Sequence, residues 1–362
     1  MTRAVVFAYH DVGVRCLRVL LAHGIEVPLV ITQADSPGET IWFDSVARHA
    51  AWHGLPVLMP EDANAPEVLA RVRAAQPDFL FSFYYRQMLG APLLEAPRRG
   101  AYNMHGSLLP RYRGRVPVNW AVLNGERETG ATLHAMTVKP DAGAIVAQQA
   151  VPILPDDTAV EVFRKVTLAA EIALDRCLPA LVDGTAVLTP QDLSRGSYFG
   201  RRTARDGAID WRRGAAAVHN LVRAVAPPYP GAFTEAQGLP LRILRSLPLP
   251  LAWPPRAAAA TTAPATGAAE PAGADLIARG AGAAVSPTPA DAGPAAGADA
   301  GATAASAAWQ PLLVWHEGAV LALCHDGALK LLEFELGDGI TDAREFHRRF
   351  GGQALALKPV LE

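Results

Sequence analysis

The sequence predicts an α/β fold with a doubly wound, mostly parallel sheet, followed by a small β-barrel domain. The first half alternates short apolar runs with amphipathic stretches, as strands and their covering helices do. The later part contains short strand-like runs separated by turns, and 362 residues are enough for two domains with separate cores. We expect a first domain over residues 1–192, a linker over 193–204 and the barrel domain over 205–362.

The elements of the first domain follow from its apolar periodicity. Amphipathic stretches that end at a Gly or Pro, such as Gly24, predict helices between the apolar strands. Two alternating runs flank Pro140-Asp141-Ala142-Gly143, which is typical of two strands joined by a turn. A long helix from about Val160 to Leu178 is expected to stop at Pro179. The expected strands are 4–8, 27–31, 79–83, 101–104, 132–138 and 145–153, and the earlier helices are 14–22, 45–53 and 65–75.

The second domain is interrupted by an insert of unusual composition. From about Pro254 to Ala308 the chain consists mainly of Ala, Gly, Pro and Thr, without an aromatic residue. Such a segment buries too little apolar surface to offset about 1 to 2 kcal/mol of backbone entropy per residue. We therefore expect a disordered loop within the barrel. A short helix is expected at 215–225, and strand-like sequence resumes at 311–315 and 328–334.

Charge and composition exclude several kinds of partner. The formal net charge is −2, so no overall positive field attracts nucleic acid or anionic lipid. No run approaches the roughly 20 apolar residues that span a bilayer, and the N-terminus reads as a strand and not as a signal peptide. We expect a cytoplasmic protein without membrane insertion. Cys16, Cys177 and Cys324 are far apart and lack metal-ligand spacing, so we expect neither disulfides nor structural zinc.

Polar residues follow the strand expected at 101–104. Asn103 and His105 are two residues apart, so their side chains lie on the same side of an extended segment. Ligands bind at the carboxyl ends of strands in open α/β sheets, so this pair would face a cleft. A lone Asn or His at a strand end is nevertheless more often structural, and Asp141 beside Gly is by default a turn residue. The residue types therefore allow a catalytic site here without requiring one.

These residues belong to a longer ordered motif. It reads Asn103-x-His105-x-Ser107-Leu108-Leu109-Pro110, then Arg113-Gly114, then Asp141-Ala142-Gly143. The motif resembles the signature of the 10-formyltetrahydrofolate-dependent formyltransferases. The resemblance extends from Met1 to about Phe233 and resumes at about Leu312. Five segments are similar to the branch of that family that formylates UDP-4-amino-4-deoxy-L-arabinose: Phe81-Ser82-Phe83-Tyr84-Tyr85-Arg86, His105-Gly106-Ser107-Leu108-Leu109-Pro110, Tyr112-Arg113-Gly114-Arg115, Phe199-Gly200-Arg201-Arg202-Thr203 and Pro230-Gly231-Ala232-Phe233.

The resemblance implies a catalytic domain that binds folate, followed by a barrel that resembles an OB-fold. It implies that Asn103, His105 and Asp141 are catalytic, with 10-formyltetrahydrofolate as co-substrate and without a metal. An amide can donate to an oxyanion, an imidazole can relay a proton, and a carboxylate can orient that imidazole and favour its charged form. The positions that match the family's folate-binding stretches are Gln87, Met88, Leu89, Arg115, Thr137, Val138, Lys139, Pro140 and Asp141.

The same resemblance implies a small-molecule acceptor, the amine of a UDP-amino-sugar. The formylated sugar would enter lipid A modification and reduce binding of cationic antimicrobial peptides.

An alternative is methionyl-tRNA formyltransferase, which uses the same donor on a different amine. The loop from Thr32 to Asp44 contains no Lys or Arg, which argues against binding a polyanion. Basic residues elsewhere could replace it, because Arg201, Arg202, Arg205, Arg212 and Arg213 are close in sequence.

Two other classes of enzyme share parts of this pattern. Related deformylases carry the same Asn, His and Asp behind an additional regulatory domain, whereas here the first strand begins at once. A nicotinamide-dependent dehydrogenase would need a GxGxxG loop, which the segment from Ala8 to Gly13 lacks. Many members of the arabinose branch are fused to a decarboxylase half that is absent after Glu362. We therefore expect a monofunctional transferase.

Overall fold

The computed structural model describes residues 1–36, 38, 40–249 and 309–360. Residues 1–249 and 310–360 belong to one compact unit. The insert expected at 254–308 lies outside the described residues, so its disorder stays a prediction, as do the domain limits at 192 and 205.

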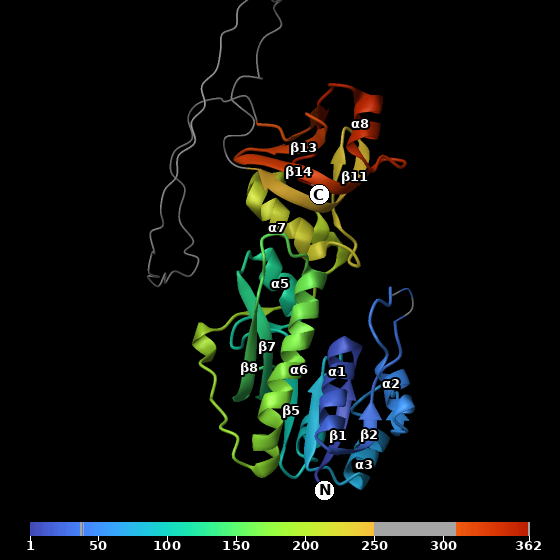
Figure 1. The fold of residues 1–362 in the computed structure, drawn as a ribbon, viewed down its shortest axis with the longest axis vertical. Coiled ribbons are helices and arrows are strands. Elements are labelled where there is room, and N and C mark those ends of the chain that lie inside the picture. The colour runs from blue at the N-terminus through green and yellow to red at the C-terminus, as the bar shows by residue number, and fades with distance from the viewer. Residues whose placement is uncertain (37, 39, 250–308, 361–362) are drawn as a thin grey trace, which may run out of the picture. The chain divides into compact units, whose positions relative to one another are not determined.

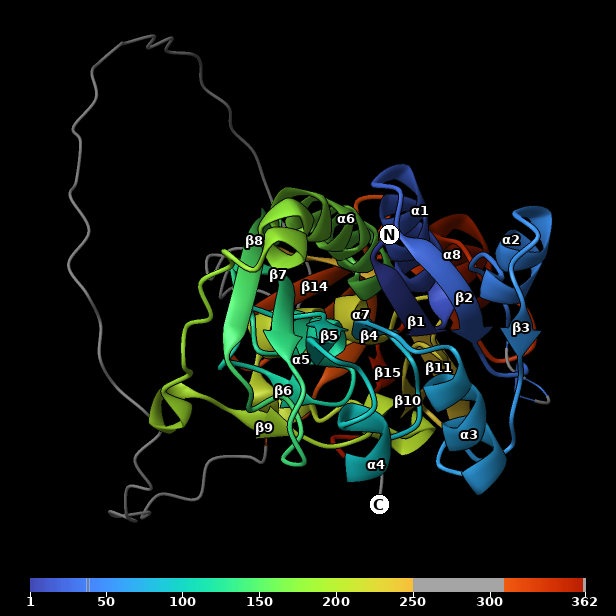
Figure 2. The same cartoon turned by 90° about the horizontal axis from the view of Figure 1, so that it is seen from below.

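A seven-stranded sheet forms the first part of the chain (Figure 1). Its strand order is β3-β2-β1-β4-β5-β7-β8, as can be followed in Figure 2. The strands from β3 to β5 are parallel, and β7 and β8 extend the sheet in antiparallel pairs. Because β1 pairs with both β2 and β4, the strand order reverses there, and this is where ligands bind in doubly wound folds. The strands are β1 Arg3–Ala8, β2 Glu26–Ile31, β3 Val57–Leu58, β4 Phe79–Phe83, β5 Gly100–His105, β7 Glu128–Ala135 and β8 Ile145–Pro152.

Helices cover both faces of this sheet (Figure 2). Adjacent residues of β1 enter different cores: Val6 packs in the cluster that includes Leu17 of α1, whereas Val5 packs with Val68 of α3. This alternation is what a strand buried on both faces requires, and the predicted fold class is confirmed. The helices of this part are α1 His10–Ala22, α2 Val46–Trp52, α3 Pro66–Ala74, α4 Ala91–Leu94, α5 Pro117–Leu123 and α6 Ala159–Asp183.

Two helix limits differ from the sequence prediction by four or more residues, His10 against Val14 and Asp183 against Leu178. Helix α6 continues through Pro179 to Asp183 and ends at Gly184, whose φ of 77° is left-handed. A proline removes one backbone hydrogen bond, but Leu178 and Leu181 on either side are buried against the sheet, and their burial stabilises the helix beyond the proline. Helix α1 begins at His10, four residues before the predicted start, because buried Val12 and Gly13 also pack inward.

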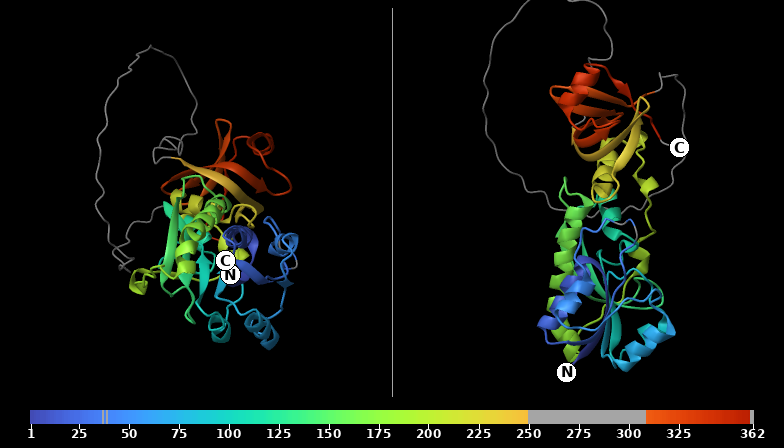
Figure 3. Two further views of the ribbon diagram at one scale, coloured as in Figure 1. Left: turned by 60° about the horizontal axis from the view of Figure 1, so that its bottom comes forward. Right: turned by 90° about the vertical axis from the view of Figure 1, so that its right-hand side faces the viewer.

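The C-terminal part forms a nearly closed antiparallel barrel (Figure 3). Its sheet has the order β10-β11-β14-β13-β12-β15, and a bridge between Ala236 and Leu357 joins its two ends. Helix α7, Ala215–Val225, packs against β11, and α8, Ala343–Phe350, packs on β12 and β13. The described residues contain no helix with the length and apolar character needed to cross a bilayer. The strands are β10 Ala232–Ala236, β11 Leu239–Leu249, β12 Leu312–His316, β13 Ala319–Cys324, β14 Gly327–Leu336 and β15 Leu355–Ala356.

The connection between these two sheets carries short elements. Strand β9, Tyr198–Phe199, pairs in parallel with β6, Arg113–Gly114, from the first part of the chain. This two-stranded ladder brings residues 198–199 beside the loop that follows β5. The short 3-10 helices are Leu193–Arg195, Ala204–Gly207 and Trp211–Arg213.

The barrel core depends on Trp211, which is 0% exposed and donates its indole N–H to Thr234 Oγ1 at 3.3 Å. We expect Trp211→Ala to lower the free energy of unfolding by about 3 to 5 kcal/mol, because it leaves a cavity in the barrel core and removes the hydrogen bond to Thr234. Urea denaturation measures this change. Trp52→Ala is the matched control, since Trp52 is 83% exposed and its loss should leave the midpoint nearly unchanged. Equal midpoints for both variants would contradict the prediction.

Candidate active site

His105 is the last residue of β5, and its imidazole is buried and held in one orientation. Its Nε2 lies 2.8 Å from the carbonyl oxygen of Tyr112. A carbonyl oxygen only accepts hydrogen bonds, so Nε2 carries the proton. The other ring nitrogen, Nδ1, lies 3.6 Å from Oδ1 of Asp141. Nδ1 is therefore the nitrogen that can gain or lose a proton during a reaction.

Asp141 lies in the turn between β7 and β8, with a left-handed φ of 52°. Its Oδ2 accepts a hydrogen bond from the backbone N–H of Gly114 at 2.9 Å. Its Oδ1 lies 3.6 Å from His105 Nδ1 and 3.6 Å from His134 Nε2. Asn103, His105 and Asp141 thus converge as the sequence motif predicts, although Asp141 is distant in the chain. Their catalytic roles stay a prediction.

His134 is a functional candidate that the sequence analysis did not identify. It lies directly opposite Asn103 in the antiparallel pair of β5 and β7. Its Nδ1 lies 2.9 Å from the carbonyl oxygen of Ala135, and its Nε2 lies 3.2 Å from Asn103 Nδ2 and 3.6 Å from Asp141 Oδ1. The contact with Asn103 orients its amide. A histidine inside an alternating strand gives no local signal, and only the pairing register with β5 could have revealed it.

The environment sets the charges of the two titratable groups at neutral pH. Burial lowers the pKa of His105 below its ordinary value, although the Asp141 charge and the Tyr112 carbonyl oppose this shift. Burial alone would raise the pKa of Asp141, but His105, His134 and the Gly114 N–H together lower it well below its usual range. At pH 7 the pair is therefore a neutral imidazole beside an ionised carboxylate. Such a pair can accept a proton on Nδ1 and stabilise the resulting imidazolium.

One cleft of ≈ 1320 Å³ contains most of the predicted site residues. Gln87 lines the cleft, but its side chain is hydrogen-bonded within the protein. Its Oε1 accepts from the Ala63 N–H and its Nε2 donates to the Glu61 carbonyl. Val138 and Lys139 do not line the cleft, and Val138 is 76% exposed. The predicted residues that line it are Asn103, His105, Asp141, Gln87, Met88, Leu89, Arg115, Thr137 and Pro140.

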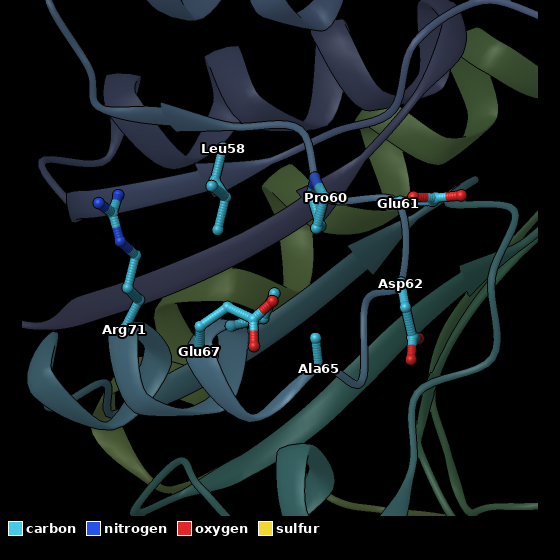
Figure 4. A pocket seen from close by; sticks show the side chains of 8 residues that line it. Leu58, Pro60, Glu61, Asp62, Ala65, Glu67 and Arg71 are labelled. Atoms are coloured by element: carbon cyan, nitrogen blue, oxygen red, sulfur yellow. The ribbon is translucent and has the colours of Figure 1, made fainter.

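A second, smaller cavity of ≈ 620 Å³ lies beside β3 and α3 (Figure 4). Its polar lining is mostly acidic, with Glu61, Asp62 and Glu67 near Arg71. None of the predicted site residues lines it. The larger cleft is therefore the candidate active site.

The loop from Arg111 to Val116 orients both His105 and Asp141. Tyr112 and Gly114 have φ values of 57° and 96°, so the backbone turns its Tyr112 carbonyl toward His105 and its Gly114 N–H toward Asp141. Only glycine fits at 114, because a Cβ there would lie 2.2 Å from the Phe199 carbonyl oxygen.

We expect Gly114→Ala to disturb Asp141 and to lower the free energy of unfolding by about 1 to 3 kcal/mol through backbone strain. Urea denaturation measures the loss of stability. Gly200→Ala is the control, because nothing lies within 4 Å of a Cβ at that glycine of the neighbouring segment. If the two variants were equally stable, the packing of β6 against β9 would not constrain the loop.

Asp141 should also control the titration of His105. Because the Asp141 charge raises the pKa of His105 against the effect of burial, Asp141→Asn should move the midpoint of His105 to a still lower pH. The imidazole carbon and nitrogen signals in an NMR titration report this midpoint, with His105→Ala as the assignment control. An upward shift in Asp141→Asn would show that the carboxylate does not act on this ring.

Comparison with known proteins extends these observations. A family model described as formyl transferase matches residues 19–178, and one described as formyl transferase, C-terminal domain, matches residues 202–274.

Solved structures of similar fold include an N-formyltransferase from Helicobacter canadensis, crystallised with folinic acid and dTDP-3-aminofucose. It is 18% identical, with a TM-score of 0.61, and the match covers 91% of this chain and 99% of that one. WlaRD, a sugar 3N-formyl transferase crystallised with dTDP and 5-N-formyl-THF, is 17% identical over 91% and 97% of the chains, with a TM-score of 0.60. A sugar N-formyltransferase from a Shewanella species is 19% identical over 64% and 92%, with a TM-score of 0.53.

At such identities the solved structures show a shared fold. The family models add the kind of enzyme, because one matches the sheet that carries Asn103, His105 and Asp141 and the other matches the start of the barrel. The chain therefore belongs to the formyl transferase family.

Proposed function

We propose that this enzyme transfers the formyl group of 10-formyltetrahydrofolate to the amine of a UDP-amino-sugar, UDP-4-amino-4-deoxy-L-arabinose. The observation that carries the proposal is the convergence of Asn103, His105 and Asp141 on one cleft of ≈ 1320 Å³. Single ligands commonly occupy about 300 to 1000 Å³, so this cleft has room for two co-substrates. The Helicobacter canadensis structure, with a folate and a sugar nucleotide bound together, supports such a pairing.

The chemistry follows from the protons that must move. The amine attacks the formyl carbon, a tetrahedral oxyanion forms, and the bond to the folate nitrogen breaks. The amine loses a proton and the folate nitrogen gains one, so the reaction needs a relay. His105 Nδ1 supplies it, since Nε2 is bound to the Tyr112 carbonyl. Asp141 stabilises the transient imidazolium, and the Asn103 amide donates to the oxyanion.

Folate binding is proposed at the cleft residues that match the family's folate stretches. These are Gln87 to Leu89, Arg115, and Thr137 with Pro140 and Asp141. The Gln87 side chain holds the segment at residues 61–63, so we propose that residues 87–89 contact the pterin mainly through their backbone. Polar backbone groups beside an apolar lining suit a flat heterocycle with many donors and acceptors.

Charge argues for the sugar acceptor over tRNA. The described part of the loop between β2 and α2 presents acids, with Asp35 accepting from the Tyr9 hydroxyl and the Asp44 N–H donating to Asp11. Arg212 is paired with Asp210. A tRNA would need cations along the loop between β2 and α2 to neutralise phosphates, and residues 32–44 contain no Lys or Arg. The proposal retains the expectation of a cytoplasmic enzyme whose product enters lipid A modification.

The test supplies the enzyme with 10-formyltetrahydrofolate and one of three acceptors: UDP-4-amino-4-deoxy-L-arabinose, methionyl initiator tRNA, or water alone. Mass spectrometry should show a gain of one formyl group on the sugar nucleotide. A formylated tRNA would replace the proposal with its nearest alternative. Release of formate without any acceptor would indicate a deformylase.

If His105 and Asp141 are catalytic, replacing either one should lower the turnover number of the enzyme. We expect His105→Ala and Asp141→Ala each to reduce kcat by about 100-fold or more, because each removes a proton-transfer or charge-stabilising group. His23→Ala is the control, since His23 pairs with Asp175 away from the cleft. Initial-rate kinetics with thermal unfolding separates lost chemistry from lost fold. Folded variants with normal kcat would remove the pair from the mechanism.

A further inference from the structure

The segment that follows β9 brings two arginines to the active-site cleft. Arg201 and Arg202 line it, together with Arg86 and Arg115 from the first part of the chain. The acidic residues in its lining are Glu61 and Asp141, and Asp141 is already held by His105, His134 and Gly114. The cleft therefore has an excess of positive charge, which favours an anionic ligand.

Backbone pairing places this segment close to the reacting groups. Tyr198 and Phe199 pair with Arg113 and Gly114, and the Arg115 N–H donates to the Phe199 carbonyl at 2.9 Å. Gly114 itself binds the Asp141 carboxylate. Arg201 follows Phe199 by two residues, so its Cα lies at most about 7 Å along the chain from this ladder.

The two guanidinium groups differ in how they are held. Arg202 lies over the Trp120 ring at 4.8 Å from its centroid and donates one hydrogen bond to the Asp206 carbonyl. Burial lowers the pKa of Arg202, but the ordinary pKa of arginine is so high that the side chain stays charged at neutral pH. Most of its N–H groups are available to a ligand, since the Asp206 carbonyl accepts from one of them. Among the described residues, Arg201 is exposed and its side chain has neither a hydrogen bond nor an ion pair.

We propose that Arg201 and Arg202 bind the diphosphate of the sugar nucleotide. This inference rests on the proposed function and assigns residues to its acceptor. A guanidinium fork matches the paired oxygens of a phosphate, and two adjacent arginines offset the two charges of a diphosphate. In a 4-amino sugar the amine and the diphosphate-bearing carbon lie on opposite sides of the ring. Arginines beside the β6–β9 ladder would therefore bind the diphosphate at one side of the sugar ring while the amine faces His105 at the other.

The test uses the full-length enzyme with UDP as the probe in isothermal titration calorimetry. Losing a charge-assisted hydrogen bond weakens binding by roughly 10- to 100-fold, so we expect the Kd for UDP to rise by that factor in Arg201→Ala and further in Arg201→Ala with Arg202→Ala. Arg201→Lys should recover part of the affinity. Arg205→Ala is the control, because Arg205 is an exposed arginine of the same connection that does not line the cleft.

Steady-state kinetics then separates this subsite from the folate site. The variants should raise KM for the sugar nucleotide at least 10-fold and leave KM for 10-formyltetrahydrofolate within about twofold. A rise for the folate alone would assign the arginines to its glutamate carboxylates and overturn the inference, as would an unchanged Kd for UDP. Thermal unfolding verifies that each variant is folded. Arg202→Ala loses the contact with Trp120 and can be less stable for that reason, whereas Arg201→Ala tests the subsite without this loss.

Failure of the proposed function gives a different result. In that case the unaltered enzyme would neither bind UDP nor formylate the UDP-amino-sugar, and the inference would fall with it. If the unaltered enzyme formylates the UDP-amino-sugar but all variants bind UDP with equal affinity, the inference is wrong and the proposed function stands.

Discussion

The active site depends on two backbone groups of one loop, the Tyr112 carbonyl and the Gly114 N–H. The first accepts from His105 Nε2, and the second donates to Asp141 Oδ2. Neither backbone group titrates, so both side chains keep their orientation over a wide pH range. The carbonyl decides which imidazole nitrogen is free, and the N–H helps to keep the carboxylate ionised despite its burial. The path of the main chain through residues 112–114 thus determines the geometry of His105 and Asp141.

That loop in turn depends on the connection to the barrel. Tyr112 stacks on Phe199 with ring centroids 5.2 Å apart, Phe199 stacks on Trp120 at 4.8 Å, and Arg202 covers Trp120. The β6–β9 ladder joins the same two segments through their backbones. The proposed proton relay and the proposed diphosphate subsite therefore rest on one packed column of rings.

The fold could be predicted where local patterns decide it. The apolar runs of β1, β2, β4 and β5 are buried on both faces, and such runs are recognisable without tertiary information. Asn103 and His105 could be placed on one side of their strand from period-2 geometry. Pro179 misled the prediction because packing of α6 against the sheet outweighs the missing hydrogen bond. The β6–β9 ladder and the contact of His134 with Asn103 join residues distant in sequence, which propensity and periodicity do not report.

Two regions of the cleft differ in charge: the Asp141 carboxylate lies beside His105, and arginines line another part. Asp141 interacts with His105, His134 and Gly114, so its negative charge is not available to neutralise the arginines of the cleft. If Asp141 instead paired with Arg115 or Arg201, His105 would lose the carboxylate that favours its protonated state, and the anion subsite would lose a cation. The hydrogen bond from the Gly114 N–H holds Asp141 Oδ2, while Oδ1 faces the imidazole of His105. The same short loop therefore separates the proposed proton relay from the cationic part of the cleft.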